Sequence, residues 1–424
     1  MSLLRALSIA ALLSLLACTR APRFGDTIPE WRLAGCIELI EGERCVPPPG
    51  RRLVAWAAVP RPFDWVVRVD GRWRAVPGKH EVRDDGVTST LQLPKGALEL
   101  RLEGTALRVR IESRAWAGVP DLAALARSDP ARALAKIEAL SPEDEVHAVH
   151  LSYAGWLAER RLEGVAPRSI ERLRQRAMEV GALRLASDLS AVVAYRRAAT
   201  RDVFGLEALL GAWPDGPTSH IDEAHTRARL AYTVGDFAAA LRFAERAVRE
   251  AERVSDPVAQ TDARVMAAGA LGQLGLPGDG ARLLAGAEVA GPCMEAALTS
   301  TEGWLWLEAN DLDRAQASLE RALGAKCPRG ASEALLLNQS ALALRTDEIA
   351  QAQQHLDRAL VAFGGASLDY LEAKAGVAAR AGRDARAVEA YAALEARARA
   401  SARPDIVALA RFGRSRVEVE AAGE

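Results

Sequence analysis

The sequence predicts a mainly α-helical protein in which a solenoid of helical hairpins follows a small β-sandwich or partial barrel. In the C-terminal half, small residues return at intervals of 35 to 40 residues, a spacing typical of stacked helical hairpins. Nearer the N-terminus, short apolar runs alternate with glycine- and proline-containing turns, which indicates strands. We expect six segments: a signal peptide (1–17), a tether (18–30), a β domain (31–115), degenerate helical hairpins (116–217), regular repeats (218–402), and a terminal helix and tail (403–424).

The first segment has the features of an export signal. Arg5 is followed by an apolar run from Ala6 to Ala17, which is too short to span a bilayer as a helix. The run ends in Leu15-Leu16-Ala17-Cys18, which resembles the cleavage box of bacterial lipoproteins. The resemblance implies acylation of Cys18 as the first mature residue, and Thr19 favours the outer membrane, facing the periplasm or the cell surface. Cleavage as an ordinary signal peptide is the alternative.

The β domain is predicted from alternation and from one strong turn. Asp70-Gly71 separates the runs 63–69 and 72–76, as expected for a two-residue hairpin. Further runs at 37–40, 53–56, 87–93, 98–102 and 107–111 bring the expected total to about seven strands. In the run 98–102, Leu98, Leu100 and Leu102 are expected on the core face.

The four cysteines after Cys18 are candidates for disulfides, because exported proteins form them readily. Cys36 and Cys45 flank a predicted hairpin that would bring them together. Cys293 and Cys327 lie one repeat apart, each beside a proline in a predicted connection between repeats. Equivalent points of neighbouring repeats would lie too far apart for a bridge without loop distortion, so this second pairing stays open.

Residues 116–217 carry four or five alanine-rich helical patterns that follow the repeat period poorly. Asp129-Pro130 is a good helix start, and Ser141 is a plausible N-cap before Glu143 and Asp144.

The regular repeats share three small positions. The middle position recurs at intervals of 40, 35, 37 and 35 residues, and the other two lie twelve residues before it and seven after it. The first set is Ala228, Ala268, Gly303, Ser340 and Ala375, the middle set is Ala240, Gly280, Ala315, Ala352 and Ala387, and the last set is Ala247, Ala287, Ala322, Ala359 and Leu394. Together with turns such as Gly235-Asp236-Phe237 and Asn310-Asp311-Leu312, this pattern resembles the tetratricopeptide repeat family.

In that family the first helices of the repeats line a concave groove that binds a protein or peptide. Transferring the groove positions by the small-residue register gives a set of candidate partner-binding residues. These are His225, Arg229, Tyr232, Trp304, Glu308, Arg345 and Arg380. Trp304 and Tyr232 are natural anchors, although packing of Trp304 between repeats is an equal alternative.

The composition and motifs do not favour catalysis, metal binding or nucleic-acid binding. The 55 basic and 56 acidic residues nearly cancel, whereas nucleic-acid binding needs a concentrated basic face. His220 and His225 are five residues apart, about 140° around a helix, and so do not share one face. His147 and His150 share a face but lack a third ligand nearby. We therefore expect no metal, no cofactor and no catalytic residue.

The order of modules is similar to the front part of some bacterial proteins that end in a CHAT peptidase, whose His-Gly and Ser-Ala-Cys surroundings do not occur here. The sequence thus predicts a non-enzymatic envelope scaffold or adaptor. The alternatives are a regulatory partner of an exported CHAT-type protease, and a carbohydrate-binding protein that stacks sugars on Trp56, Trp65 and Trp73 of the β domain.

Overall fold

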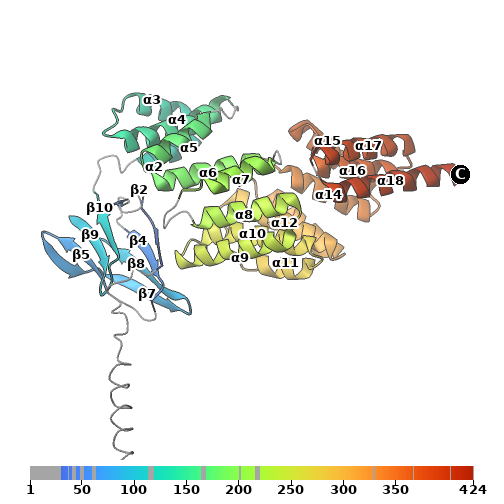
Figure 1. The fold of residues 1–424 in the computed structure, drawn as a ribbon. Helices are drawn as coiled ribbons and strands as arrows, with labels where there is room; N and C mark the ends of the chain where they lie inside the picture. Colours follow the sequence, from blue (N-terminus) through green and yellow to red (C-terminus); the bar gives the residue numbers. More distant parts are fainter. Residues whose placement is uncertain are drawn as a thin grey trace, which may run out of the picture. The chain divides into compact units, whose positions relative to one another are not determined.

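The computed structural model describes residues 30–36, 38–40, 44–47, 52–59, 64–112, 119–163, 169–199, 202–214, 220–327, 330–365, 367–401 and 403–423. The predicted signal peptide and Cys18 lie outside these residues. The chain divides into two compact units (Figure 1). Unit 1 comprises residues 1–189 with the short segments 214–219 and 253–255, and unit 2 comprises 190–213, 220–252 and 256–424. The boundary between residues 189 and 190 falls within a helix, inside the segment 116–217 that the sequence predicts as degenerate hairpins.

Unit 1 begins with a β-sandwich. Its described strands are β1 (Trp31–Ala34), β2 (Glu38–Ile40), β3 (Arg44–Val46), β4 (Arg52–Ala57), β5 (Trp65–Val69), β6 (Arg72–Ala75), β7 (Gly78–Arg83), β8 (Gly86–Gln92), β9 (Ala97–Leu102) and β10 (Arg108–Ile111). One sheet has the order β1-β4-β8-β7 and the other β2-β3-β10-β9-β5-β6. The strand pairs are antiparallel except for β3 with β10. The described strands are more numerous than expected, but the predicted sandwich is confirmed.

The core of the sandwich is formed by alternate residues of both sheets. Leu53 of β4, Val67 of β5 and Leu100 of β9 are fully buried in one cluster. The hairpin between β5 and β6 turns at Asp70 and Gly71, whose φ angles of 50° and 77° are those of a left-handed two-residue turn. The predicted hairpin is therefore present.

The prediction for Leu98 is wrong. Val69 of β5 pairs with Ala97, whereas Arg68 pairs with Glu99, so Leu98 is an extra residue in the ladder. Such a bulge shifts the alternation by one position. Ala97 therefore enters the core, and Leu98 is 52% exposed.

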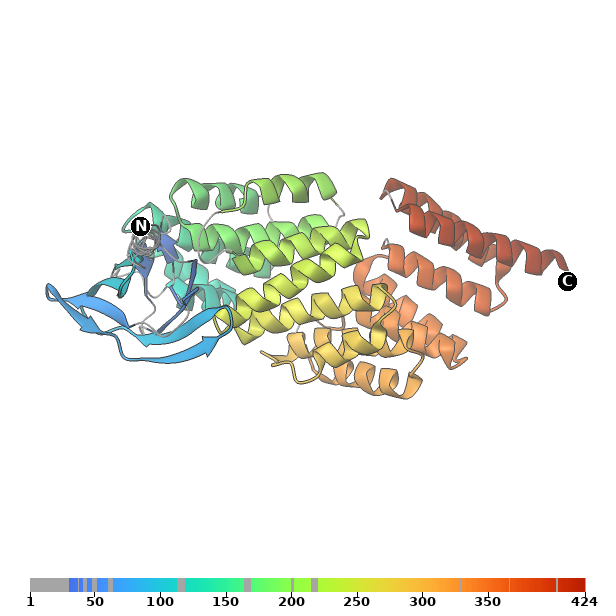
Figure 2. The same ribbon diagram turned by 60° about the horizontal axis from the view of Figure 1, so that its bottom comes forward.

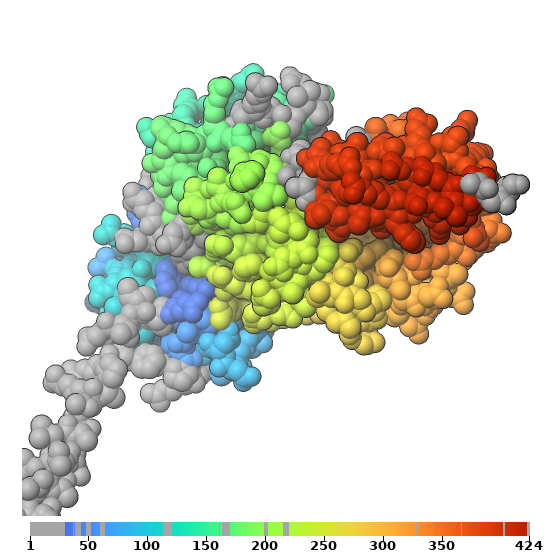
Figure 3. Space-filling view, turned by 45° about the vertical axis from the view of Figure 1, so that its right-hand side comes forward, coloured from blue at the N-terminus to red at the C-terminus, as the bar shows by residue number. Residues whose placement is uncertain are grey.

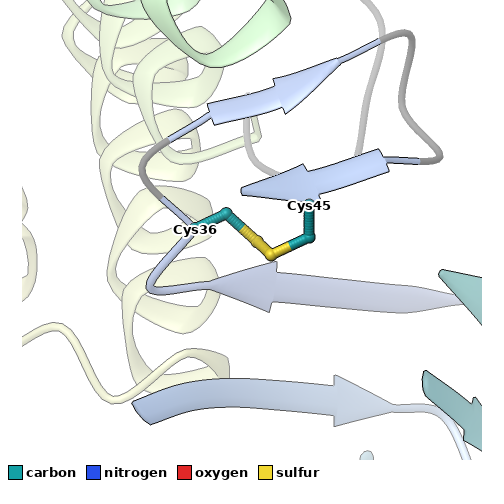
Figure 4. The surroundings of a disulfide bond; sticks show 2 residues. All are labelled: Cys36 and Cys45. Atoms are coloured by element: carbon teal, nitrogen blue, oxygen red, sulfur yellow. A yellow bond between two sulfur atoms is a disulfide. The ribbon is translucent and has the colours of Figure 1, made fainter. Parts of the chain in front are cut away.

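A disulfide joins Cys36, just before β2, to Cys45 of β3 (Figure 4). The two Cα atoms are 5.6 Å apart, because β2 and β3 pair as an antiparallel hairpin. Both cysteines are buried in the core of the sandwich. The bridge and the core thus stabilise the same small domain.

Six described helices precede the regular repeats, whereas the sequence predicted four or five. They are α2 (Val119–Ser128), α3 (Pro130–Glu138), α4 (Glu145–Glu163), α5 (Ser169–Glu179), α6 (Leu183–Ala199) and α7 (Val203–Gly211). Asp129 caps α3 as predicted, accepting a hydrogen bond from the N–H of Arg132. Ser141 does not cap α4, because Asp144 accepts the hydrogen bond from the N–H of His147 and the helix begins at Glu145.

Besides the second half of α6 and α7, unit 2 contains five helical hairpins and a final helix, which follow one another from yellow-green to red in Figure 2. The pairs are α8 (His220–Val234) with α9 (Phe237–Arg253), α10 (Pro257–Gln273) with α11 (Pro277–Leu284), α12 (Pro292–Glu308) with α13 (Leu312–Gly324), α14 (Glu333–Arg345) with α15 (Ile349–Phe363), and α16 (Leu368–Arg380) with α17 (Asp384–Ala400). The last helix is α18 (Pro404–Gly423). This is a tetratricopeptide-like helical repeat fold, as the sequence predicts.

The small residues lie where the two helices of a hairpin approach most closely. A Cβ atom added to Gly280 would lie 2.8 Å from the carbonyl oxygen of Ala268, twelve residues earlier. In the fourth repeat the hydroxyl of Ser340 donates to the carbonyl of Ala352 at 3.0 Å. Both positions of the register therefore face each other, and longer side chains would separate the helices.

A second disulfide joins Cys293 to Cys327, with Cα atoms 4.5 Å apart. The expectation that these points would lie far apart is wrong. Cys293 lies in the first turn of α12, and Cys327 lies just after the end of α13. Because α12 and α13 run antiparallel as one hairpin, its entry and its exit lie at the same end.

Among the described helices, none is both long enough and apolar enough to cross a bilayer.

Candidate functional site

The seven predicted groove residues all lie on the first helices of the repeats. His225, Arg229 and Tyr232 belong to α8, Trp304 and Glu308 to α12, Arg345 to α14, and Arg380 to α16. Helix α10 has Gly269 and Gly272 at the positions equivalent to Arg229 and Tyr232. We call the side of these helices that carries the seven residues the inner face.

The α8 part of the inner face combines a neutral imidazole with a partly desolvated arginine. Burial, with a contribution from nearby Arg229, lowers the pKa of His225 to about 3, so its ring is uncharged at neutral pH. The Arg229 guanidinium lies 5.1 Å from the centre of the Tyr195 ring, a cation–π contact. Burial lowers the pKa of Arg229 and raises that of Asp262 on α10, while the attraction between the two charges opposes both shifts.

Tyr232 and Trp304 lie against the glycines of α10. A Cβ atom added to Gly269 would lie 3.8 Å from the Tyr232 ring, an ordinary contact. One added to Gly272 would lie 2.5 Å from the Trp304 ring, which is too close for any real side chain. Trp304 therefore packs into a notch between consecutive first helices, while part of its surface remains accessible. Its use as a partner anchor stays a prediction.

The remaining predicted residues form ion pairs between consecutive repeats. Arg345 on α14 lies 3.4 Å from Glu308 on α12, and its guanidinium also donates to the Leu307 carbonyl. Arg380 on α16 lies 3.4 Å from Asp347, in the turn after α14. These arginines connect neighbouring repeats, and both keep solvent-exposed surface.

The structure adds a charged cluster that the sequence prediction missed. It comprises Asp369 and Glu372 on α16, Arg403 before α18, and Asp405 in the first turn of α18. Arg403 donates from Nε and Nη2 to the two carboxylate oxygens of Asp405, at 2.9 and 2.6 Å. Burial raises the pKa of Glu372, and the nearby carboxylates of Asp369, Glu308 and Asp405 raise it further.

The cluster extends across the inner face to α8. Burial raises the pKa of Tyr232, and the charges of Asp369 and Arg403 act on the same hydroxyl, although these residues lie more than a hundred positions further along the chain. Charges on α16 and just before α18 therefore act on the Tyr232 hydroxyl of α8, and Glu308 of α12 acts on Glu372 of α16. Figure 3 shows the surface of unit 2 hollowed between the yellow helices and the red ones.

One signal in the sequence points to the missed acids. Asp262 and Asp369 lie six residues before the small residues Ala268 and Ala375, one position in the repeat register. Six residues advance an α-helix by about 600°, so a residue at that position lies about 120° around the helix from the notch. Arg403 and Asp405 follow the last repeat, so the repeat register could not predict them.

Arg403 also lines a pocket of about 500 Å³ between the end of α17 and the start of α18. The other lining residues are Arg399, Pro404, Val407, Ala408 and Arg411. Arg399 and Arg411 both donate to Glu395 at 2.6 Å, so one carboxylate serves two lining arginines. The pocket therefore combines an apolar wall with an excess of positive charge.

The histidines considered as metal ligands take part in other contacts. Among the described residues, no group of three or more His, Cys, Asp or Glu side chains is placed to hold a metal ion. The ring Nδ1 of His147 accepts from the N–H of Glu143 at the start of α4. His150 Nε2 lies 3.0 Å from the buried carboxylate of Glu38, which also accepts from the N–H groups of Arg184 and Leu185 at the start of α6.

The three tryptophans proposed for sugar stacking lie in different environments. Trp65 is buried in the core of the sandwich, and Trp56 is buried with Arg32 5.7 Å from its ring. Trp73, on the edge strand β6, is 36% exposed. The three indoles therefore do not form one stacking platform.

No protein-family model matches the sequence, and no curated protein matches it. Several solved structures are similar to parts of the chain. PilW, described as a widely conserved type IV pilus biogenesis factor, is 16% identical with a TM-score of 0.36, covering 50% of this chain and 92% of its own. A Rap protein complexed with Competence and Sporulation Factor is 9% identical with a TM-score of 0.47, covering 72% and 98%. BtubC from P. vanneervenii is 15% identical with a TM-score of 0.30, covering 56% and 93%. At these values the similarities carry no information about what this chain binds.

Proposed function

We propose that this chain is a non-enzymatic scaffold that binds a protein or peptide partner on the inner face of unit 2. The observation that supports the proposal is the convergence of polar side chains from α8, α12, α16 and α18. Arg403 acts electrostatically on both Tyr232 and Glu372, and Glu308 from another repeat acts on Glu372. The hairpins pack through the small residues together with buried Leu and Tyr side chains, and Glu308 and Glu372 are exposed to solvent, where a partner can reach them.

The charge of the inner face indicates the kind of partner. Around α16 it carries Glu308, Asp369, Glu372 and Asp405 against Arg403 and Arg345, while Arg380 is paired with Asp347, so negative charge still predominates. The raised pKa of Glu372 reflects burial and unfavourable proximity to like charges. A partner that brings a lysine or arginine side chain to this point would relieve that repulsion.

We further propose that the chain is exported and anchored to the outer membrane through an acylated Cys18, an arrangement that Thr19 after the cleavage box favours.

Site-specific photo-crosslinking in cells tests the binding proposal. A photoreactive phenylalanine analogue is introduced at Glu308 or at Glu372 on the inner face. The matched control is Glu320, an exposed residue on the second helix α13. We expect a discrete cross-linked species from the two inner positions and none from Glu320, with the partner then identified by mass spectrometry.

The outcomes of this experiment separate the alternatives. Equal cross-linking from Glu320, or none from either inner position, contradicts binding on the inner face. An adduct with an exported CHAT-type peptidase would identify the scaffold as the regulatory partner of that enzyme. Radioactive palmitate incorporation that survives Cys18→Ala would contradict acylation at that residue.

A further inference from the structure

The six-stranded sheet of unit 1 has an outer face that is rich in arginine. Val67, Leu100 and Val109 point into the core, so the residues that alternate with them point outward. Arg68 of β5 pairs with Glu99 of β9, and Glu99 pairs with Arg110 of β10, forming one row across the sheet. Arg101 and Arg108 pair in the next row.

This face carries a clear excess of positive charge. Arg44 of β3 pairs with Arg110 in the parallel ladder and lies 3.6 Å from Glu112. Glu99 lies 3.2 Å from Arg68 and 3.9 Å from Arg108, and its own side chain is only 14% exposed. The outward-facing charges of this sheet are Arg44, Arg68, Arg101, Arg108, Arg110, Glu38, Glu99 and Glu112. Glu38 of β2 is buried against α4 and α6, so the accessible part of the face lies on β5, β9 and β10. Five arginines against three glutamates leave the surface cationic.

An indole lies beside these arginines. Trp73 of the edge strand β6 pairs with Arg68 and so belongs to the same face. The Arg101 guanidinium lies 4.1 Å from the centre of the Trp73 ring. The ring remains 36% exposed. Exposed tryptophan next to arginine suits a membrane interface, where an amphipathic ring sits among headgroups and cations meet phosphates.

We propose that this arginine face docks onto a bilayer surface containing anionic phospholipids. Neighbouring strands about 4.8 Å apart hold the arginines of β5, β9 and β10 close together on one side of the sheet, where several can meet lipid phosphates at once. The net positive charge provides the attraction, and the exposed Trp73 provides a group that inserts at the headgroup level. The proposed anchor would favour this contact, because twelve residues from Cys18 to Glu30 span at most about 40 Å.

This inference extends the anchoring part of the proposed function, but its test does not depend on acylation. The experiment uses residues 19–424, which retain every described residue and lack Cys18. Sedimentation with vesicles of phosphatidylcholine alone is compared with vesicles containing phosphatidylglycerol. We expect binding only to the anionic vesicles, decreasing as sodium chloride rises from 0.05 to 0.5 M because salt screens the charges.

Two matched double variants locate the binding surface. Arg108→Gln with Arg110→Gln removes two charges from the arginine face, and we expect partitioning to fall about 25-fold, since each arginine near an anionic surface contributes about fivefold. Arg132→Gln with Lys136→Gln removes the same charge from exposed positions of α3 and should change partitioning less than twofold. Trp73→Ala should weaken binding without changing its salt dependence.

Several results would overturn the inference. They are equal losses in the two double variants, equal binding to neutral and anionic vesicles, and binding to a soluble acidic polysaccharide without binding to vesicles. Circular dichroism of each variant checks that the fold is kept. Because the anchor is absent throughout, a negative result here leaves the proposed acylation of Cys18 to its own labelling experiment.

Discussion

Trp304→Ala is expected to lower the free energy of unfolding of unit 2 by about 3 kcal/mol, because the indole fills the notch at Gly272. Replacing a buried tryptophan by alanine costs about 3–5 kcal/mol, and the partial exposure of Trp304 places the cost at the lower end. A pure partner anchor would instead leave stability within about 0.5 kcal/mol of the unmodified chain. Urea unfolding followed by far-ultraviolet circular dichroism measures the difference.

A double-mutant cycle makes this test specific for the notch. Gly272→Ala alone places its Cβ 2.5 Å from the Trp304 ring and should destabilise the chain by about 1–3 kcal/mol through overpacking. In the Trp304→Ala background that ring is gone, and the close contact that remains, 2.7 Å to Cδ2 of Leu305, is with the end of a flexible side chain that can shift into the space left by the indole. The higher helix propensity of alanine, about 1 kcal/mol over glycine, should then make the same change neutral or stabilising.

The reversal of sign is the decisive result. If the two substitutions are additive, the ring and the glycine do not share the notch, because residues in contact show a coupling energy. The packing assignment of Trp304 would then be abandoned in favour of the anchor role. Cross-linking from the inner face is measured in parallel, so that loss of binding can be compared with loss of stability.

Two further predictions concern unit 2. Replacing both Cys293 and Cys327 by serine should lower the free energy of unfolding by about 3.8 kcal/mol, the chain-entropy value for a 34-residue separation. The same change at the nine-residue Cys36–Cys45 bridge should cost about 2.6 kcal/mol. Urea unfolding measures both losses, and a smaller loss at the longer bridge would contradict this ranking. Glu372→Gln should stabilise the chain at pH 7, which a thermal melt would show as a higher melting temperature. The gain in the free energy of unfolding should not exceed about 1 kcal/mol, because solvent screens the charge. Its folded pKa is raised above 4.5, so the carboxyl is stabilising when protonated, and this contribution is lost as pH rises through the folded pKa. The gain should therefore disappear near pH 4, and a gain of equal size there would exclude the charge as its cause.

Much of the local structure follows from residues that are close in the sequence. Asp70-Gly71 specifies its hairpin because glycine and aspartate tolerate positive φ, and that kind of turn suits paired strands. Cys36 and Cys45 meet because one short hairpin lies between them. The repeats can also be predicted from the sequence, because every hairpin needs short side chains where its two helices cross.

Other features depend on contacts that local patterns do not contain. Leu98 leaves the core because of a bulge, which depends on the pairing of β9 with β5. Cys293 and Cys327 are bridged because they are the entry and the exit of one hairpin, whereas the repeat period suggested equivalent points of two neighbours. The missing information in both cases is which segment pairs with which.

The sequence by itself determined the repeat, the positions of its small residues and the helices that carry the candidate groove. Only the tertiary structure decided that Trp304 fills a notch in α10 and that Tyr232 shares a space with Asp369 and Arg403. The physical reason is that a repeat pattern specifies each contact between neighbours. The meeting of distant repeats depends on small rotations accumulated over the whole stack.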